Sequence, residues 1–236
     1  MKKGQLLYEG KAKRLYTTED PNILFVEYKD SATAFNGEKK EEIAGKGILN
    51  NRITTVLFEK LQANGIPSHF VKRLSEHEQL VRKVEIIPIE LVVRNIAAGS
   101  LAQRLGLAEG TPLKRPIVEF YYKNDDLGDP HITTEHIDVL DIATPAEVQA
   151  LYENGLKINN VLRPIFEDIG VELIDFKLEF GRDQDGNILL ADEISPDTCR
   201  LWDTKTKQKL DKDVFRRNLG SLTEGYEIIL TRLGGQ

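Results

Sequence analysis

Within residues 171–181, positions 174–180 alternate strictly between apolar and ionisable side chains. Every even position from 174 to 180 is apolar, whereas the odd positions between them carry Asp175, Lys177 and Glu179. Because successive side chains of a strand point to opposite faces, this pattern predicts a strand with one face in the core and one charged face. Shorter apolar runs separated by turn residues predict further strands. These span residues 5–9, 14–16, 23–28, 69–73, 79–84, 85–94 and 188–195.

Three other segments have the spacing of apolar residues that is typical of helices. The first predicted helix runs from about residue 43 to 64. The second begins at Thr144, which precedes Pro145 and lies three residues before Glu147, the arrangement of a capping box. The last spans roughly residues 212–233. Helices mixed with hairpin-forming strands in this way predict an α+β fold.

Pro88 interrupts the strand predicted over residues 85–94. Proline cannot donate to a strand ladder, so this position predicts either an edge strand or a bulge. A lobe boundary is placed just before this strand, near Val84. It divides the chain into an N-terminal lobe of residues 1–84 and a C-terminal lobe of residues 85–236.

Composition narrows the classes of protein that remain. The chain has 236 residues, of which 40% are hydrophobic, and its net charge is -6. That size and apolar content suffice for a core, and the negative charge argues against a broad nucleic-acid surface. A single cysteine cannot form an internal disulfide, and no run approaches the roughly 18 apolar residues of a membrane span. We therefore expect a cytoplasmic protein with neither a nucleic-acid nor a membrane partner.

The turn that follows the charged strand suggests a metal site. Asp185 and Gly186 form the dipeptide preferred in two-residue hairpins, and such a turn places Glu179 directly opposite Asp192. Two carboxylates opposed across a ladder repel each other unless a cation lies between them. We interpret the pair as a Mg²⁺ site, beside which Lys177 could hold a phosphate or carboxylate. The alternative is a solvated outer face of a sheet, which would seldom oppose two acids.

Two further segments are candidate anion sites. Residues 9–13 lie between two short predicted strands, and backbone N–H groups near Gly10 could close with two lysines over nucleotide phosphates. The alternative for this segment is a plain surface hairpin. Farther along, Arg94 precedes Ser100, which predicts a helix N-cap whose free N–H groups suit a phosphate monoester. Arg200 could reach the same ligand, whereas the alternative is an ordinary cap with a surface arginine.

Three segments together closely resemble the SAICAR synthetase family of purine biosynthesis. They are residues 86–100, 173–181 and 192–197, and the resemblance extends from Tyr8 to the final helix. It implies a two-lobed, ATP-grasp-like α+β fold with a kinase-like antiparallel N-terminal lobe, and a homodimer. It also implies an ATP-dependent C–N ligase that joins carboxyaminoimidazole ribonucleotide (CAIR) to L-aspartate and gives SAICAR, ADP and phosphate, with ATP and Mg²⁺ as cofactors.

The resemblance also implies roles for individual residues. Those implied to bind nucleotide are Gly10, Lys11, Ala12, Lys13, Arg82, Lys83, Val84, Glu179 and Asp192. The last two are also the implied metal ligands. Those implied to bind the ribonucleotide are Arg94, Ser100, Asp175, Lys177 and Arg200. The implied catalytic residues are Lys13, Asp175 and Lys177.

The placement of L-aspartate depends on a polar loop near the N-terminus. We expect residues 30–37 to hold it, the alternative being a mobile surface loop. Excluding water from a reactive intermediate would be a reason for residues 29–42 to close as a lid.

The expected chemistry is phosphorylation of the imidazole carboxylate by ATP, followed by attack of the aspartate amine on the acyl phosphate. Two other interpretations stay open. A small-molecule kinase would release ADP without any dependence on aspartate. A non-catalytic nucleotide-binding regulator would bind ATP without hydrolysing it, although the paired acids favour catalysis.

Overall fold

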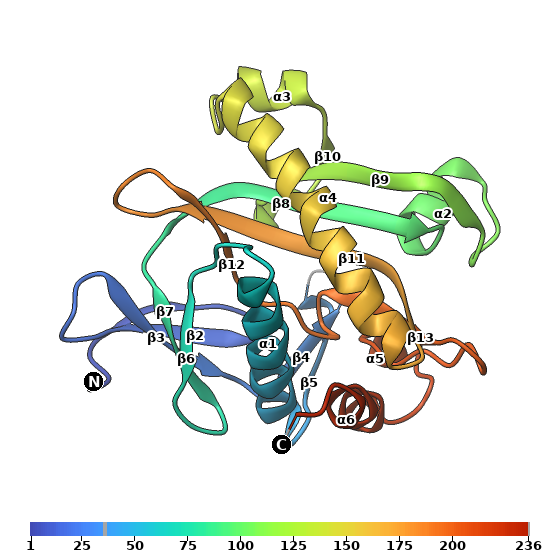
Figure 1. Cartoon of the computed structure of the whole chain (residues 1–236), viewed down its shortest axis with the longest axis horizontal. Helices are drawn as coiled ribbons and strands as arrows, with labels where there is room; N and C mark the ends of the chain where they lie inside the picture. The colour runs from blue at the N-terminus through green and yellow to red at the C-terminus, as the bar shows by residue number, and fades with distance from the viewer. Residues whose placement is uncertain (35–36, 236) are drawn as a thin grey trace.

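The computed structural model describes residues 1–34 and 37–235. In this part of the chain, strands form three antiparallel sheets and helices pack around them (Figure 1). The helices are α1 (Lys46–Ala63), α2 (Gly99–Leu105), α3 (Thr134–Val139), α4 (Pro145–Asp168), α5 (Asp213–Arg216) and α6 (Leu222–Arg232), with the 3-10 turn η2 (Asp125–Leu127). The strands are β1 (Leu6–Glu9), β2 (Lys13–Thr17), β3 (Ile23–Tyr28), β4 (Ser31–Ala34), β5 (Lys39–Glu42), β6 (Phe70–Arg73), β7 (Glu78–Arg82), β8 (Glu85–Ile96), β9 (Pro112–Tyr122), β10 (His131–Ile132), β11 (Val171–Arg182), β12 (Ile188–Ala191) and β13 (Cys199–Asp203). None of the helices in the described ranges is both long and apolar enough to cross a membrane.

The first sheet has the strand order β1-β2-β3-β7-β6 and ends before residue 84. Its strands were predicted to within a few residues, because each is a short apolar run bounded by turn residues. Leu24 and Val26 of β3 pack with Val81 of β7 in a small core beneath the sheet. A separate hairpin of β4 and β5 lies in the polar stretch where no strand was predicted.

The second sheet has the order β10-β9-β8-β11-β12, and β13 pairs with the other half of β11. Helix α4 packs across this sheet (Figure 1). Its close approach requires glycine at position 155, where a Cβ would lie 2.4 Å from a methyl carbon of Leu91 on β8. The apolar positions 174, 176, 178 and 180 of β11 are all buried, as the alternation predicted.

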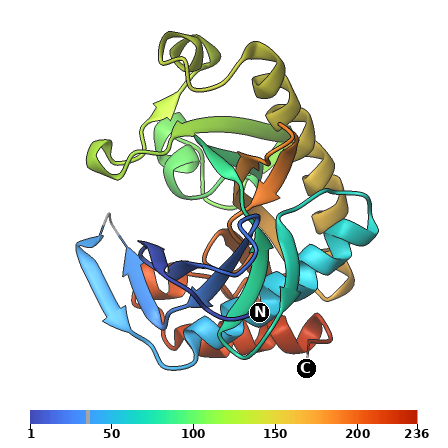
Figure 2. The same cartoon turned by 90° about the vertical axis from the view of Figure 1, so that its left-hand side faces the viewer.

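The two sheets meet at a short junction, and they lie in the lower and upper halves of Figure 2. The N–H of His69 donates to the carbonyl of Leu190 at 2.8 Å, and the N–H of Leu190 donates to the carbonyl of Pro67 at 3.1 Å. The last helix, α6, returns to pack against α1. The lobe boundary near Val84 remains a prediction, and a division there would separate these two packed helices.

The hairpin between β11 and β12 differs from its prediction. The N–H of Gly186 donates to the carbonyl of Asp183, and Gly186 has a φ of 80°. A type I turn followed by a left-handed glycine makes a three-residue loop, so the register pairs Glu179 with Ala191. The predicted opposition of Glu179 and Asp192 across the ladder is therefore wrong. Strand β12 also ends early, because Asp192 adopts a φ of 57° and leaves the ladder.

Two predicted helix boundaries are also corrected. The last predicted helix is split into α5 and α6, because Asn218 and Gly220 have φ values of 54° and 134° and break it. Helix α2 begins at Gly99, with Ala98 as its N-cap. Ser100 is therefore inside the first turn, and it is not the N-cap that was predicted.

Of the two alternatives raised by Pro88, the bulge is confirmed and the edge strand is wrong. Strand β8 is central, between β9 and β11. Its ladder to β11 is irregular around Pro88, since Glu90 pairs with Glu179 whereas Ile86 pairs with Gly181. Between these two pairs, β11 has one residue whereas β8 has three, and Pro88 is the middle one of the three. The proline therefore lies outside a regular ladder.

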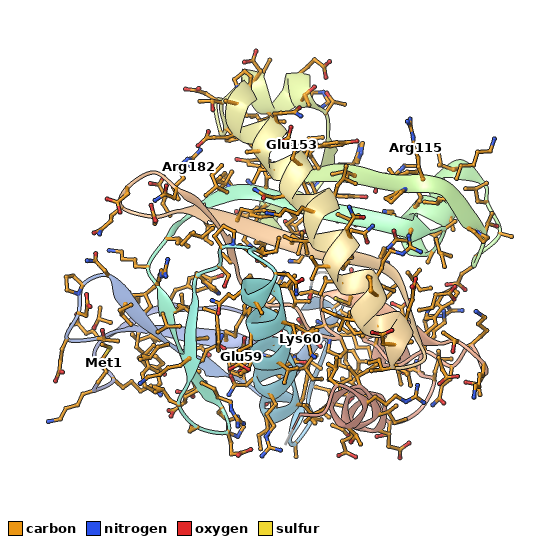
Figure 3. All side chains as sticks on the ribbon, in the orientation of Figure 1. Met1, Glu59, Lys60, Arg115, Glu153 and Arg182 are labelled. Atoms are coloured by element: carbon orange, nitrogen blue, oxygen red, sulfur yellow. The ribbon has the colours of Figure 1, made fainter. Side chains whose placement is uncertain are left out.

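The capping box predicted at the start of α4 is confirmed. The backbone N–H of Thr144 donates to Oε2 of Glu147 at 2.8 Å, and the N–H of Glu147 donates to the Thr144 hydroxyl. Arg182 of β11 donates to both carboxylate oxygens of Glu147 (Figure 3 labels Arg182). These hydrogen bonds, first those from Arg182, lower the pKa of Glu147 to about 2. Glu147 thus ties the helix to the sheet as well as capping it.

We expect Glu147→Gln to lower the free energy of unfolding near pH 7 by about 1–2 kcal/mol, allowing for solvent screening of a partly exposed pair. The folded pKa is depressed below 4.5, so the ionic contribution is complete above that pH and is lost as the pH falls toward 2. Urea unfolding near pH 7 and near pH 3 measures the difference, which should shrink at the lower pH. Glu153→Gln, an exposed change on the same helix (Figure 3), is the control. A difference that is the same at both pH values would contradict this account.

Candidate functional site

A cavity of about 750 Å³ lies between the first and second sheets. It collects most of the residues that were singled out from the sequence. Those that line it are Gly10, Lys11, Ala12, Lys13, Arg82, Val84, Arg94, Asp175, Lys177, Glu179, Asp192 and Arg200. Two predicted residues are not among its lining. The N–H of Lys83 donates to the carbonyl of Asn22, and the Ser100 hydroxyl accepts a hydrogen bond from Arg94.

One part of the cavity wall is apolar. It is formed by strands β2, β3 and β7 of the first sheet and by the chain that leaves β7. The apolar side chains there are Leu15, Leu24, Val26, Val81, Val84 and Ile86. An apolar surface beside a few polar groups is typical of sites that bind a flat organic ring.

The hairpin between β1 and β2 carries two lysines of this wall. The N–H of Gly10 donates to the carbonyl of Lys13 at 2.8 Å, which closes the turn tightly. Lys11 reaches across to Asp125 of η2, with 2.8 Å between its Nζ and the carboxylate. Because both of these side chains are largely exposed, their ion pair is weak and can be exchanged for a ligand at little cost.

Lys13 points inward and is paired with two acids. Its Nζ contacts the carboxylate of Asp192 and lies 3.2 Å from Oε1 of Glu193. Burial alone would lower the pKa of Lys13, but these two carboxylates hold it well above its usual value. Burial would raise the pKa of Asp192, whereas the ammonium groups of Lys13 and Lys177 hold it at about 2. Both groups are therefore charged at neutral pH.

A second row of alternating charges crosses from β11 to β8. Nζ of Lys177 lies 2.6 Å from Glu90 and 3.0 Å from Glu179, and Nζ of Lys123 lies 2.9 Å from Glu179. Burial alone would lower the pKa of Lys177, but Glu179 and Glu90 raise it far above its usual range. This part of the cavity therefore holds lysine ammonium groups whose positions are fixed by carboxylates. Such fixed positive charges can stabilise the negative oxygens of a phosphate group.

Arg94 forms the centre of the far end of the cavity, and its side chain is only 4% exposed. Its guanidinium donates to Glu119 at 2.6 Å, to Asp175 at 2.7 Å and to the Ser100 hydroxyl at 3.1 Å. Arg200 donates to the same Asp175 carboxylate at 2.9 Å. The alternative of a surface arginine beside an ordinary cap is therefore wrong, because two arginines converge on one buried carboxylate.

Gly99 permits Arg200 to reach this position. A Cβ at Gly99 would lie 2.5 Å from Nη2 of Arg200, and the φ of Gly99 is 50°, in the region that favours glycine. Arg200 is also anchored from the other side by Asp213 of α5, 3.0 Å from its Nε. The two arginines and the backbone of Gly99 therefore make a rigid cationic surface that suits a phosphate monoester.

The charged face of β11 is not the solvated sheet face of the alternative interpretation. Asp175 and Glu179 are 3% and 6% exposed, because the face is turned into the cavity. Glu179 and Asp192 line the same cavity although the ladder does not oppose them. Among the residues in the described ranges, no group of three or more His, Cys, Asp or Glu is placed to hold a metal ion. The role of Glu179 and Asp192 as metal ligands stays a prediction.

Several residues of the site were missed from the sequence. The charged residues that line the cavity without having been singled out are Glu90, Lys123, Asp125, Asp129, Glu193, Asp197, Lys212 and Arg216. Glu90 could have been found, since it lies on the same face of a period-two strand as Arg94. The other seven lie outside regular strands or in a helix whose bounds were predicted wrongly, and the sequence contains no local signal for their placement.

The segment predicted to hold L-aspartate is only partly visible. Thr33, Ala34 and Gly37 line the cavity. Residues 35 and 36 lie outside the described residues, so the predictions for residues 30–37 and 29–42 cannot be followed through them.

Comparisons with known proteins agree with one another. A family model described as SAICAR synthetase matches residues 6–233. The phosphoribosylaminoimidazole-succinocarboxamide synthase of Lysinibacillus sphaericus (strain C3-41) is 79% identical over 236 residues, with 100% of both chains covered. That of Bacillus subtilis (strain 168) is 62% identical over 233 residues, with 99% of this chain and 97% of the relative covered.

Solved structures give the same answer. The crystal structure of phosphoribosylaminoimidazole-succinocarboxamide synthase from Ehrlichia chaffeensis has a TM-score of 0.96 and 48% identity, over 98% of this chain and 99% of that one. A SAICAR synthetase in complex with ADP has a TM-score of 0.94 and 49% identity, over 97% of each chain. The predicted two-lobed α+β fold is thereby confirmed.

Proposed function

This chain belongs to the SAICAR synthetase family, from which we infer that it is an ATP-dependent ligase of purine biosynthesis. It joins the carboxylate of CAIR to the amine of L-aspartate and forms SAICAR, ADP and phosphate. The main structural support for this function is a single cavity. It has an apolar wall, lysines paired with carboxylates, and two arginines at its far end. The alternatives of a kinase and of a passive nucleotide-binding regulator are not favoured.

The nucleotide would lie along the first sheet. The apolar wall near Arg82 and Val84 suits adenine, and the hairpin that carries Lys11 and Lys13 suits the phosphates. A solved SAICAR synthetase is in complex with ADP, which supports nucleotide binding by this chain. Because Lys11 is held only by a weak exposed pair with Asp125, it can turn toward the phosphates when they arrive.

Mg²⁺ fits the donors that this chain offers. Carboxylate oxygens are the ligands that Mg²⁺ prefers, and Asp192 is ionised at neutral pH because its pKa lies at about 2. Glu179 and Asp192 would hold the ion, which when bound would neutralise charge on the phosphate oxygens. The lysines that now pair with these carboxylates would then face the phosphates directly.

The ribonucleotide would lie along the second sheet. Arg94, Ser100 and Arg200 offer a cationic surface for its phosphate, and Asp175 fixes the two arginines in place. Lys177 lies farther along β11, where it could hold the carboxylate of the imidazole. Its strongly raised pKa keeps it positively charged throughout.

The reaction then needs two displacements, the first at phosphorus and the second at the acyl carbon. The CAIR carboxylate attacks the terminal phosphorus of ATP, which forms an acyl phosphate and releases ADP. The amine of L-aspartate attacks the acyl carbon, so that a C–N bond forms, the C–O bond to phosphate breaks and the amine loses a proton. Lys13 and Lys177 neutralise the negative charges that these steps bring together.

Further parts of the proposal rest on the family resemblance. L-aspartate would be held by residues 30–37, and closure of residues 29–42 would exclude water from the acyl phosphate. Residues 1–84 would form the nucleotide-binding lobe, and residues 85–236 would carry the metal and ribonucleotide sites. We expect a cytoplasmic homodimer that acts on small molecules, with neither nucleic acid nor membrane as a partner.

The test of this function is ADP release by the purified protein with Mg-ATP and CAIR, with and without L-aspartate, together with the mass of the product. Aspartate-dependent ADP and a succinocarboxamide product are expected. Equal ADP release without aspartate would indicate a kinase. Binding of ATP with no ADP under either condition would indicate the regulator.

The contact between Gly99 and Arg200 gives a prediction for the ribonucleotide end. Gly99→Ala should push the guanidinium of Arg200 aside and raise KM for CAIR about tenfold, since one charge-assisted hydrogen bond is weakened. Steady-state kinetics with CAIR as the varied substrate measure this, and KM for ATP should stay within about twofold.

Gly186→Ala is the matched control for Gly99→Ala. It places a Cβ at a φ of 80°, but no atom lies within 4 Å of that Cβ. The control therefore carries backbone strain of a similar kind without the contact to an arginine. Equal changes of KM for CAIR in the two variants would show that strain, not displacement of Arg200, is responsible.

A further inference from the structure

We propose that Lys46 and Tyr226, neither of which lines the cavity, are positioning residues that fix Asp197 and, through it, the ammonium group of Lys212. The inference rests on the function proposed above, since Asp197 and Lys212 line the cavity in which that reaction would occur. Under this proposal, helices α1 and α6 hold residues of the cavity wall in position.

The Asp197 carboxylate is held from both of its oxygens. The Tyr226 hydroxyl donates to Oδ1 at 2.5 Å. Nζ of Lys46 lies 2.6 Å from Oδ2, and Nζ of Lys212 lies 3.6 Å from the same oxygen. One oxygen of Asp197 is therefore shared by the fully buried ammonium group of Lys46 and that of Lys212, a residue of the cavity wall.

The burial of Lys46 is costly, which makes its presence informative. Its side chain is 0% exposed, and Asp197 is its one charged partner within 4 Å in the part of the chain that the structure describes. Replacing a buried ion pair with apolar residues is often neutral or stabilising, so folding alone does not require a lysine here. A role in placing the carboxylate accounts for the cost.

Lys46 and Tyr226 come from elements that were not expected to contribute to the site. Lys46 is the first residue of α1, directly after Gly45 with its φ of 84°, and Tyr226 lies in the middle of α6. Helices α1 and α6 pack against each other. The cluster thus joins the loop after β12, which carries Asp197, to the chain near its C-terminus.

The electrostatics show how the effect would reach the cavity. Two ammonium groups share one carboxylate, and Lys46 is the nearer of the two. Without Lys46, the attraction of Asp197 would act on Lys212 alone and shift its ammonium group toward that carboxylate. Burial first, and then the Lys46 ammonium and the Arg216 guanidinium, lower the pKa of Lys212, while Asp197 and Glu193 oppose that shift. Lys46 therefore sets both the position and the charge environment of Lys212.

The first test is Lys46→Met, which removes the charge and keeps a long apolar side chain. We expect kcat/KM for CAIR and for L-aspartate to fall about ten- to thirtyfold, with KM for ATP within about twofold. Tyr226→Phe removes one hydrogen bond to the carboxylate and should cause a loss of about three- to fivefold. Lys60→Met, an exposed change on the same helix (Figure 3), should leave all three constants unaltered.

A double-mutant cycle separates positioning from mere structural support. If Lys46 acts through Lys212, Lys46→Met should cause no further loss in the Lys212→Met background. Losses that multiply in the double variant would overturn the proposal. So would a Lys46→Met protein whose unfolding free energy falls while kcat/KM stays within about twofold of the wild type. Should Lys46→Met fail to fold, unchanged kinetics of Tyr226→Phe would overturn it.

Failure of this inference can be distinguished from failure of the proposed function. A wild-type protein without aspartate-dependent ADP release would contradict the function itself. Calorimetric titration of wild type and Lys46→Met with CAIR and with L-aspartate would then still test the positioning role. Weaker binding of either compound by the variant would support it, and equal affinities for both would overturn it.

Discussion

Glu179→Gln should lower kcat/KM for SAICAR formation by about a hundred- to thousandfold while the protein stays folded. The Glu179 carboxylate accepts from Lys123 at 2.9 Å and from Lys177 at 3.0 Å, and it is a predicted ligand of Mg²⁺. Glutamine keeps the volume, but its amide carries no charge, and one of its two ends would be an N–H donor facing the ammonium groups. Lys123, Lys177 and the metal ion would all lose the carboxylate that holds them in position.

Steady-state kinetics across a range of Mg²⁺ concentrations measure this effect, and the Mg²⁺ concentration for half-maximal rate should rise. Glu172→Gln is a matched control, because Glu172 lies on the same strand and also pairs with a lysine, 2.9 Å from Nζ of Lys207, but at the surface. It should retain wild-type rates. Full activity of Glu179→Gln at every Mg²⁺ concentration would rule out the metal role.

The alternation in residues 171–181 was enough to predict β11 and its two faces, because a strand that buries one face has a strict period of two. It was not enough to predict what the charged face meets. Asp175 and Glu179 of β11 are buried in the cavity because the first sheet stands opposite them. That arrangement depends on the junction between Pro67 and Leu190, which is a contact between segments distant in sequence.

The hairpin shows how a local signal can give the wrong register. Asp185-Gly186 is compatible both with a two-residue turn and with a three-residue loop that ends in a left-handed glycine. The choice between them shifts the pairing by one residue, which replaced Asp192 by Ala191 opposite Glu179. The two acids nevertheless reach the same cavity, because the positive φ of Asp192 turns the chain after β12.

Arg94, Ser100 and Arg200 were identified as a phosphate site from a predicted helix N-cap and then by resemblance to a family, but the role of Ser100 in the structure differs from the local prediction. Ser100 does not cap α2, and it accepts a hydrogen bond from Arg94 instead. Glu119, which holds the other edge of Arg94, could not be predicted, since it lies on β9, a strand that was not expected. Charge pairs across a sheet depend on strand order, which the sequence pattern did not specify.

Arg94→Lys should raise KM for CAIR by about a hundredfold and lower the free energy of unfolding by about 2–4 kcal/mol. The guanidinium of Arg94 donates simultaneously to Glu119, Asp175, Ser100 and Tyr121. A lysine ammonium is a single point of charge and cannot reach buried carboxylates on two sides. One of them would be left without a partner, and Arg200 would lose the fixed position of Asp175.

Kinetics with CAIR as the varied substrate and urea unfolding measure the two effects of Arg94→Lys separately. Arg104→Lys is the matched control, because Arg104 contacts the same Glu119 carboxylate from a partly exposed position. Its pair is screened by solvent, so it should change stability by less than about 1 kcal/mol and KM for CAIR by less than about threefold. An Arg94→Lys protein with wild-type KM would mean that the phosphate of CAIR binds elsewhere. Equal effects of the two substitutions would mean that the charge of Glu119, and not the fork of Arg94, organises this end of the cavity.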